Sequence, residues 1–103
     1  MKRSIVLVEF PYDDLYFDSK IRPAYALTNP IGEHRHVVLA LITSRLPPHP
    51  LATDLILDAT HPDFAVTGLK KTSVLRLNHL LTLRHSMIQR QLGGLSTKLI
   101  SKS

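Results

Sequence analysis

Residues 21–27 (IRPAYAL) lie between two apolar stretches, residues 4–10 (SIVLVEF) and residues 37–44 (VVLALITS), and these three stretches decide the fold. All three are rich in β-branched, aromatic and other apolar residues, which predicts strands. Arg22-Pro23 opens the middle strand, and Thr43-Ser44 closes the last one. A small β-barrel brings such strand ends together, and one guanidinium beside two hydroxyl groups can hold a phosphate group.

The composition is that of one ordinary globular domain covering residues 1–103. The chain has 103 residues, of which 44% are hydrophobic and 20% are charged, enough for a single modest core. Thirteen Lys and Arg against eight Asp and Glu give a formal net charge of +5, which favours a polyanionic partner. Cysteine is absent, which excludes disulfide bonds and thiolate metal sites and suits a reducing cytosol.

The segment before the first strand is too short for a signal peptide. Met1-Lys2-Arg3 leads directly into residues 4–10, and this strand ends at Pro11 because proline lacks the backbone N–H. Seven residues are also too few to span a membrane. We therefore expect a cytoplasmic protein with no membrane partner.

Further strands follow in the same domain. The second strand is expected over residues 23–28. The third is expected over residues 37–42, whose apolar side chains on both faces place it at the centre of the fold. A short strand is expected at residues 54–58, and residues 73–77 and 80–83 form either two strands or one bent strand.

The C-terminal part is expected to be helical. Met87, Ile88 and Leu92 form a short apolar stripe that ends at Gly93-Gly94, a usual position for glycines that end a helix. Ser96 can cap a further helical turn. Five or six short strands followed by a short helix predict a mainly β (α+β) fold, built on a small, closed or half-open β-barrel.

In this order, the segments resemble the PemK/MazF family of toxin–antitoxin endoribonucleases over most of the chain. The matching elements are residues 5–11, Arg22-Pro23-Ala24, residues 40–44, residues 67–71, residues 73–77 and Leu92-Gly93. The resemblance implies an SH3-like barrel, a homodimer, and cleavage of single-stranded RNA without a metal ion or other cofactor. It also implies a cognate antitoxin protein that inhibits the enzyme by occupying the RNA groove.

By position, the resemblance assigns four catalytic candidates. Arg22 matches the family's active-site arginine, and Thr43, with Ser44 beside it, matches its active-site hydroxyl. Arg76 matches a second arginine that some members use. Two positions later those members carry an aspartate proposed as general base, whereas this chain has Asn78, whose amide cannot accept a proton at neutral pH.

Six residues are candidates for binding single-stranded RNA. Aromatic rings stack on unpaired bases and cations bind the neighbouring phosphates, so the long loop at residues 11–21 is one candidate region. Two lysines before residue 73 can follow the phosphate backbone. The candidates are Tyr12, Tyr16, Lys20, Lys70, Lys71 and Asn78. Loop aromatics that pack on the core and lysines that are merely solvated are the open alternatives for these positions.

The general base is not assigned by the sequence. Histidine suits proton transfer at neutral pH best, but carboxylates are also possible. The candidates are Asp13, Asp14, Asp18, Glu33 and several histidines, of which only His34 and His36 form a recognisable pattern. His34 and His36 would lie on one side of a strand, but no third ligand stands close to them in the sequence, so we expect no metal site.

The sequence therefore predicts the toxin of a type II toxin–antitoxin pair, a sequence-selective endoribonuclease that leaves 2′,3′-cyclic phosphate and 5′-hydroxyl ends. Two alternatives stay open. One is a gyrase-binding toxin on the same fold, for which the C-terminal helix would matter and Arg22 would not. The other is an RNA-binding module without catalysis. Asn78 favours this second alternative, as does Arg3-Ser4, which stands where the family usually has an acidic residue.

Overall fold

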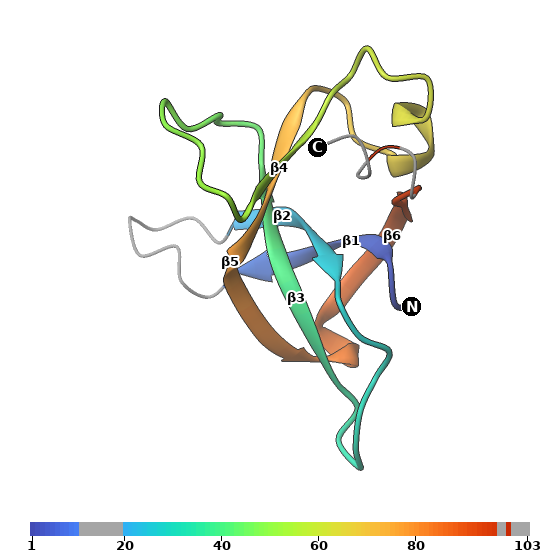
Figure 1. The fold of residues 1–103 in the computed structure, drawn as a ribbon. Helices are drawn as coiled ribbons and strands as arrows, with labels where there is room; N and C mark the ends of the chain where they lie inside the picture. The colour runs from blue at the N-terminus through green and yellow to red at the C-terminus, as the bar shows by residue number, and fades with distance from the viewer. Residues whose placement is uncertain (11–19, 97–98, 100–103) are drawn as a thin grey trace.

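The computed structural model describes residues 1–10, 20–96 and 99, and these residues are built mainly of strands (Figure 1). The strands are β1 (Ser4–Phe10), β2 (Lys20–Ala26), β3 (His36–Thr43), β4 (Asp54–Leu57), β5 (Ser73–Arg84) and β6 (Ile88–Gly94). A short 3-10 helix, η1 (Phe64–Thr67), precedes β5, and a second, η2 (His85–Met87), joins β5 to β6. The mainly β class predicted from the sequence is confirmed.

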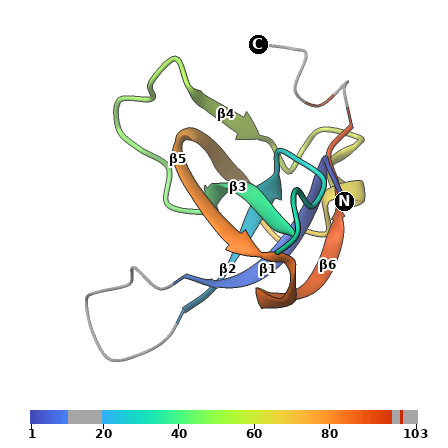
Figure 2. The same cartoon turned by 90° about the horizontal axis from the view of Figure 1, so that it is seen from below.

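All of these strands join one antiparallel sheet in the order β4-β5-β3-β2-β1-β6. Strand β3 lies in the interior of the sheet, between β5 and β2, as its apolar sequence predicts. Figures 1 and 2 show the strands crossing one another as the sheet twists and curls. Within the described residues, β4 and β6 are the two edges and do not pair with each other, so the sheet is open.

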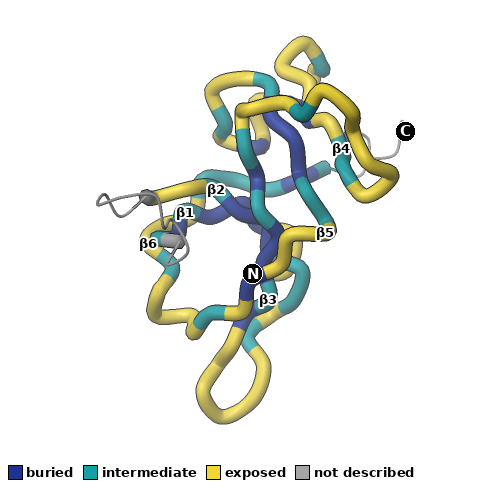
Figure 3. Tube along the Cα trace, turned by 90° about the vertical axis from the view of Figure 1, so that its left-hand side faces the viewer, coloured by how far each residue is buried: buried dark blue, intermediate teal, exposed yellow. Residues whose placement is uncertain are grey.

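Each face of the sheet carries its own hydrophobic cluster. Leu39 and Ile42 of β3 are both fully buried, and they point to opposite faces because side chains alternate along a strand. We name the two sides the Leu39 face and the Ile42 face. Figure 3 shows buried residues along the crossing strands and exposed residues in the loops. The buried cluster on the Leu39 face comprises Val6, Val8, Ala24, Ala26, Val37 and Leu39.

Strand β1 has the predicted bounds, whereas β2 is displaced from its prediction. It begins at Lys20 rather than at residue 23, so Arg22 and Pro23 lie inside the strand. Strand β3 pairs only with residues 24–26 of β2, and the residues before them pair with β1 alone. Proline is tolerated here because its missing N–H can face the unpaired side of the strand.

Strand β5 is one bent strand, which is one of the two predicted alternatives. Its register with β3 jumps from Arg76 to Leu80 between two successive residues of β3. Residues 77–79 (Leu-Asn-His) are therefore inserted without partners on β3. Inserted residues of this kind bend a strand and turn side chains outward.

The helix predicted around Met87, Ile88 and Leu92 is wrong, because residues 88–94 form β6 and pair with β1. Two apolar residues four positions apart share a face in a strand as well as in a helix, so the spacing does not separate the two. Gly93 does not end a helix. It allows β6 to approach η1 closely, since a Cβ at this position would collide with the carbonyl oxygen of Val66.

The predicted C-terminal helical turn lies mostly outside the described residues. Leu99 is helical, and its N–H donates to Oγ of Ser96 over 3.1 Å, the hydrogen bond that a serine cap makes. None of the helical segments in the described residues has the length and hydropathy that a membrane span requires.

Candidate functional site

Arg22 is positioned by β2, where it pairs with Val8 of β1 and is exposed. The last rung of the ladder between β2 and β3 pairs Ala24 with Leu41. Two residues further along these strands lie Arg22 and Thr43, in the same register. Because opposite residues point to the same face and side chains alternate, both belong to the Leu39 face. The structure thus places Arg22 and Thr43, the two main catalytic candidates, on the same face of the sheet.

Thr43 is the last residue of β3 and is half-buried. Its Oγ1 accepts a hydrogen bond from the backbone N–H of Arg45 over 3.1 Å, a common bond where a strand turns. A hydroxyl that accepts one bond can still donate its own proton. Ser44 follows in the exposed bend beyond the strand.

Arg76 belongs to the neighbouring row of the sheet, opposite Leu41 on β3 and Asp54 on β4. Its Nε donates to Oδ1 of Asp54 over 3.0 Å, and its Nη2 donates to Oδ2 over 3.4 Å. The side chain of Asp54 is fully buried, whereas that of Arg76 is 22% exposed. The Arg76 guanidinium is therefore engaged with a buried carboxylate.

Two donors favour the ionised form of Asp54. The backbone N–H of Leu51 donates to Oδ2 over 2.9 Å, and this bond contributes most to lowering the pKa of Asp54. The Arg76 guanidinium lowers that pKa further, while desolvation opposes both. The positive charge of Arg76 is thus largely offset where it stands.

The candidates for RNA contact lie in several separate segments. Lys70 and Lys71 are exposed in the turn before β5, and Asn78 is exposed among the inserted residues of β5. Lys20 is the first residue of β2, and the structure does not describe its side chain. Tyr12 and Tyr16 lie outside the described residues.

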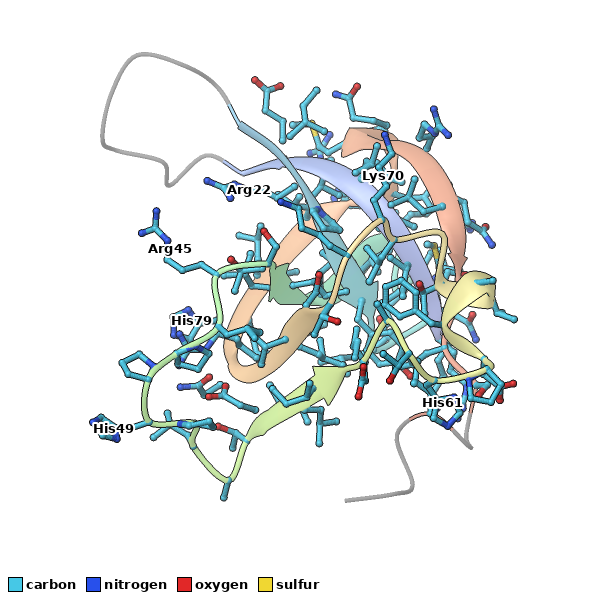
Figure 4. The ribbon with its side chains drawn as sticks, turned by 90° about the horizontal axis from the view of Figure 1, so that it is seen from above. Arg22, Arg45, His49, His61, Lys70 and His79 are labelled. Atoms are coloured by element: carbon cyan, nitrogen blue, oxygen red, sulfur yellow. The ribbon has the colours of Figure 1, made fainter. Side chains whose placement is uncertain are left out.

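Two exposed side chains that the sequence analysis did not single out lie on the same side of the molecule as Arg22. Figure 4 shows Arg22, Arg45 and His79 projecting outward along this side. Arg45 follows Thr43-Ser44 directly, so its proximity could have been recognised from the sequence. The position of His79 depends on the insertion in β5. In the described part of the chain, neither Arg22 nor Arg45 has an ion-pair partner.

The paired histidines lie elsewhere. His34 and His36 are exposed at the hairpin between β2 and β3, with ring centroids 6.2 Å apart. Across the residues that the structure describes, no three His, Cys, Asp or Glu side chains are grouped to hold a metal ion. Of the carboxylates considered as general base, Glu33 is exposed near His34, and Asp13, Asp14 and Asp18 lie outside the described residues.

These features define a small, basic, mainly β protein in which an exposed arginine lies in register with a strand-end hydroxyl. The chain belongs to the PemK-like, MazF-like toxins of type II toxin–antitoxin systems, whose family model matches residues 1–102. Among solved structures it is similar to the Mycobacterium tuberculosis toxin MazF-mt6. The identity is 26% and the TM-score 0.69, over 94% of this chain and 84% of that one. No curated protein matches it. Membership of a type II family implies an antitoxin partner.

Proposed function

We propose that this chain is a metal-independent endoribonuclease, the toxin of a type II pair, which cuts single-stranded mRNA at selected sequences. The observation that carries the proposal is the shared register of Arg22 and Thr43, which sets an exposed guanidinium across from a strand-end hydroxyl. Membership of the PemK/MazF family and the similarity to a MazF toxin support it.

In this mechanism the 2′-oxygen of the RNA attacks the adjacent phosphorus, and the bond between phosphorus and the 5′-oxygen breaks. The attacking hydroxyl gives its proton to a base, and the leaving oxygen takes up a proton. The products are therefore a 2′,3′-cyclic phosphate and a 5′-hydroxyl. Arg22 neutralises charge on the phosphorane oxygens, where one preorganised donor contributes about 3–4 kcal/mol. The Thr43 hydroxyl donates a hydrogen bond to the same phosphate. Ser44 supplies the second hydroxyl of the site.

Arg76 serves this site indirectly. Its pairing with Asp54 fixes β4 to β5 beside the row of the sheet that contains Thr43. The amide of Asn78 cannot act as the general base. His79 is our candidate for that role, because it projects on the same side as Arg22 and lies close enough to Asp54 to lower the pKa of that carboxyl.

Further contacts and partners complete the proposal. Lys20, Lys70, Lys71 and Asn78 bind the RNA, and Tyr12 and Tyr16 stack on its bases. The chain forms a homodimer in the cytoplasm, and the antitoxin inhibits it by covering the RNA-binding surface. Residues 1–103 form one domain, whose curled sheet corresponds to the SH3-like barrel of the family.

A catalytically impaired RNA-binding module is the second candidate. Asn78 favours it, because this exposed side chain cannot accept a proton where some family members have a carboxylate. The engagement of Arg76 with Asp54 favours it too, because one of the proposed catalytic charges is offset.

Incubation of the purified chain with a long single-stranded RNA in EDTA tests these proposals. Wild type is compared with Arg22→Ala and Thr43→Ala. Arg84→Ala is the matched control, because Arg84 is an exposed arginine that pairs with His36 at the opposite end of β3. We expect wild type and control to cut alike, and the two site variants to cut about 100- to 1,000-fold more slowly.

The other outcomes separate the alternatives. Equal cutting by all four proteins places the active site elsewhere, and 5′-phosphate ends overturn the mechanism. RNA binding without cutting identifies the binding module. Affinity for gyrase without affinity for RNA identifies a gyrase-binding toxin.

A further inference from the structure

We infer that Arg45 is a phosphate-binding residue of the RNA site and supplies the second cation that Arg76 does not. The inference rests on the proposed function, since it adds a contact to the same site. It follows from a difference between two arginines. Arg76 is paired with the buried carboxylate of Asp54, whereas Arg45 is exposed beside Thr43.

The ion pair with Asp54 holds the Arg76 side chain in place, because breaking this pair costs free energy. Both oxygens of Asp54 accept hydrogen bonds from Arg76, and the side chain of Asp54 is 0% exposed. If Arg76 turned toward a phosphate, the Asp54 carboxylate would lose its charged partner, which is unfavourable. RNA would therefore have to compete with an intramolecular ion pair for this guanidinium.

Arg45 has no such competition. Its backbone N–H donates to Thr43 Oγ1 over 3.1 Å, which anchors the residue beside the hydroxyl of the site. Its side chain is exposed, and no ion pair engages it in the described part of the chain. Figure 4 shows it projecting on the same side as Arg22. Thr43 thus has Arg22 across from it on β2 and Arg45 two residues after it along the chain.

The placement also predicts what kind of contact Arg45 makes. Arg22 lies within a paired strand, whereas Arg45 lies in the bend beyond β3 and has no strand to hold it. A guanidinium on a bend is less preorganised than one on a strand, so we assign Arg45 to binding of the RNA backbone before reaction. Its loss should raise KM and leave kcat nearly unchanged.

The salt dependence of RNA binding tests this inference. The probe is a single-stranded RNA with 2′-O-methyl groups, which lacks the attacking hydroxyl and so reports binding alone. The affinities of wild type, Arg45→Ala, Arg45→Lys and the control Arg84→Ala are measured across a salt series. We expect Arg45→Ala to bind about 10- to 100-fold more weakly at low salt. The slope of log K against log salt should decrease by about 0.7, the value for one lost phosphate contact on a single strand. Arg45→Lys should keep the slope, and Arg84→Ala should match wild type.

The double variant Asp54→Asn/Arg76→Gln gives the comparison for Arg76, because it removes both charges and leaves no buried ion unpaired. We expect its slope to equal that of wild type. A slope reduced in this variant and unchanged in Arg45→Ala would assign the contact to Arg76 and overturn the inference. Wild-type affinity and slope in Arg45→Ala would also overturn it.

Failure of the proposed function is distinguishable from failure of this inference. If wild type binds the methylated RNA and cuts no unmodified RNA, the enzyme proposal fails, and the Arg45 variants still decide the phosphate contact. If wild type binds no single-stranded RNA, both fail.

Discussion

Arg22 of β2 and Thr43 of β3 stand in the same register, although pairing between their strands stops two residues before them, at Ala24 and Leu41. The strands therefore carry these side chains on one face while no longer sharing backbone hydrogen bonds at this level. Arg22 keeps its pairing with Val8, which fixes its backbone from the other side. A preorganised cation and a hydroxyl on separate strands can bracket one phosphate group.

Because Arg22 and Thr43 contact the same phosphate group in the proposed site, the effects of substituting them on RNA cleavage should not be additive. Arg22→Ala and Thr43→Val should each lower kcat/KM for RNA cleavage by about 100- to 1,000-fold. The double variant should lose much less than the product of the two factors, because each residue needs the other to hold the phosphate. Thr43→Ser is the matched control, since it keeps the hydroxyl and should stay within about tenfold of wild type. A double variant that shows the full product would mean that the residues act independently.

The Asp54–Arg76 pair predicts how stability depends on pH. Hydrogen bonds from Leu51 and Arg76 lower the pKa of Asp54 in the folded chain below its ordinary value of 3.8. The stabilising effect is therefore fully present above pH 3.8 and is lost as the pH falls through the folded-state pKa. Asp54→Asn should be clearly less stable than wild type at pH 7, and the difference should be smaller at a pH well below 3.8. Denaturant unfolding at both pH values measures this difference. A gap of the same size at both would rule out the carboxylate charge as its cause.

The fold could be predicted where local sequence decides structure. Residues 37–42 are apolar on both faces because β3 is covered on both, and the first strand ends at a proline as expected. Strand β6 could not be predicted from spacing, since its structure depends on pairing with residues of β1 far away in the chain. The same limit applies to the site. Arg22 and Thr43 could be selected by resemblance, but the engagement of Arg76 depends on Asp54 on another strand.

The close approach of β6 to η1 predicts an unequal response of two adjacent glycines. Gly93→Ala should destabilise the fold by about 1–3 kcal/mol or more, because its Cβ would collide with backbone atoms of Val66 and Thr67. Gly94→Ala is the matched control, since the nearest atom to its Cβ is the carbonyl oxygen of Arg3 at 3.5 Å, an ordinary contact. Thermal unfolding should place Gly93→Ala several degrees below Gly94→Ala, at about 4–8 °C for each kcal/mol. Equal midpoints would show that β6 can move away from η1 at little cost.

The hydrogen bonds of the Thr67 hydroxyl predict that this side chain stabilises η1. Its side chain is fully buried, and its Oγ1 donates to the Phe64 carbonyl over 2.7 Å and accepts from the Leu69 N–H over 3.0 Å. Thr67→Val preserves the shape of the side chain and leaves both backbone groups without this partner, which should cost about 1–3 kcal/mol.

Thr82→Val is the matched control for this substitution, because Thr82 is exposed on β5 and should change stability by less than about 0.5 kcal/mol. Denaturant unfolding of the two variants beside wild type measures the difference. Phe64 of η1 belongs to the buried cluster on the Ile42 face, whereas Arg22 and Thr43 lie on the Leu39 face. RNA cleavage per folded molecule should therefore equal that of wild type below the unfolding transition. Equal stability of the two variants would mean that water replaces the Thr67 hydroxyl. A loss of cleavage in folded Thr67→Val would instead show that η1 is coupled to the site.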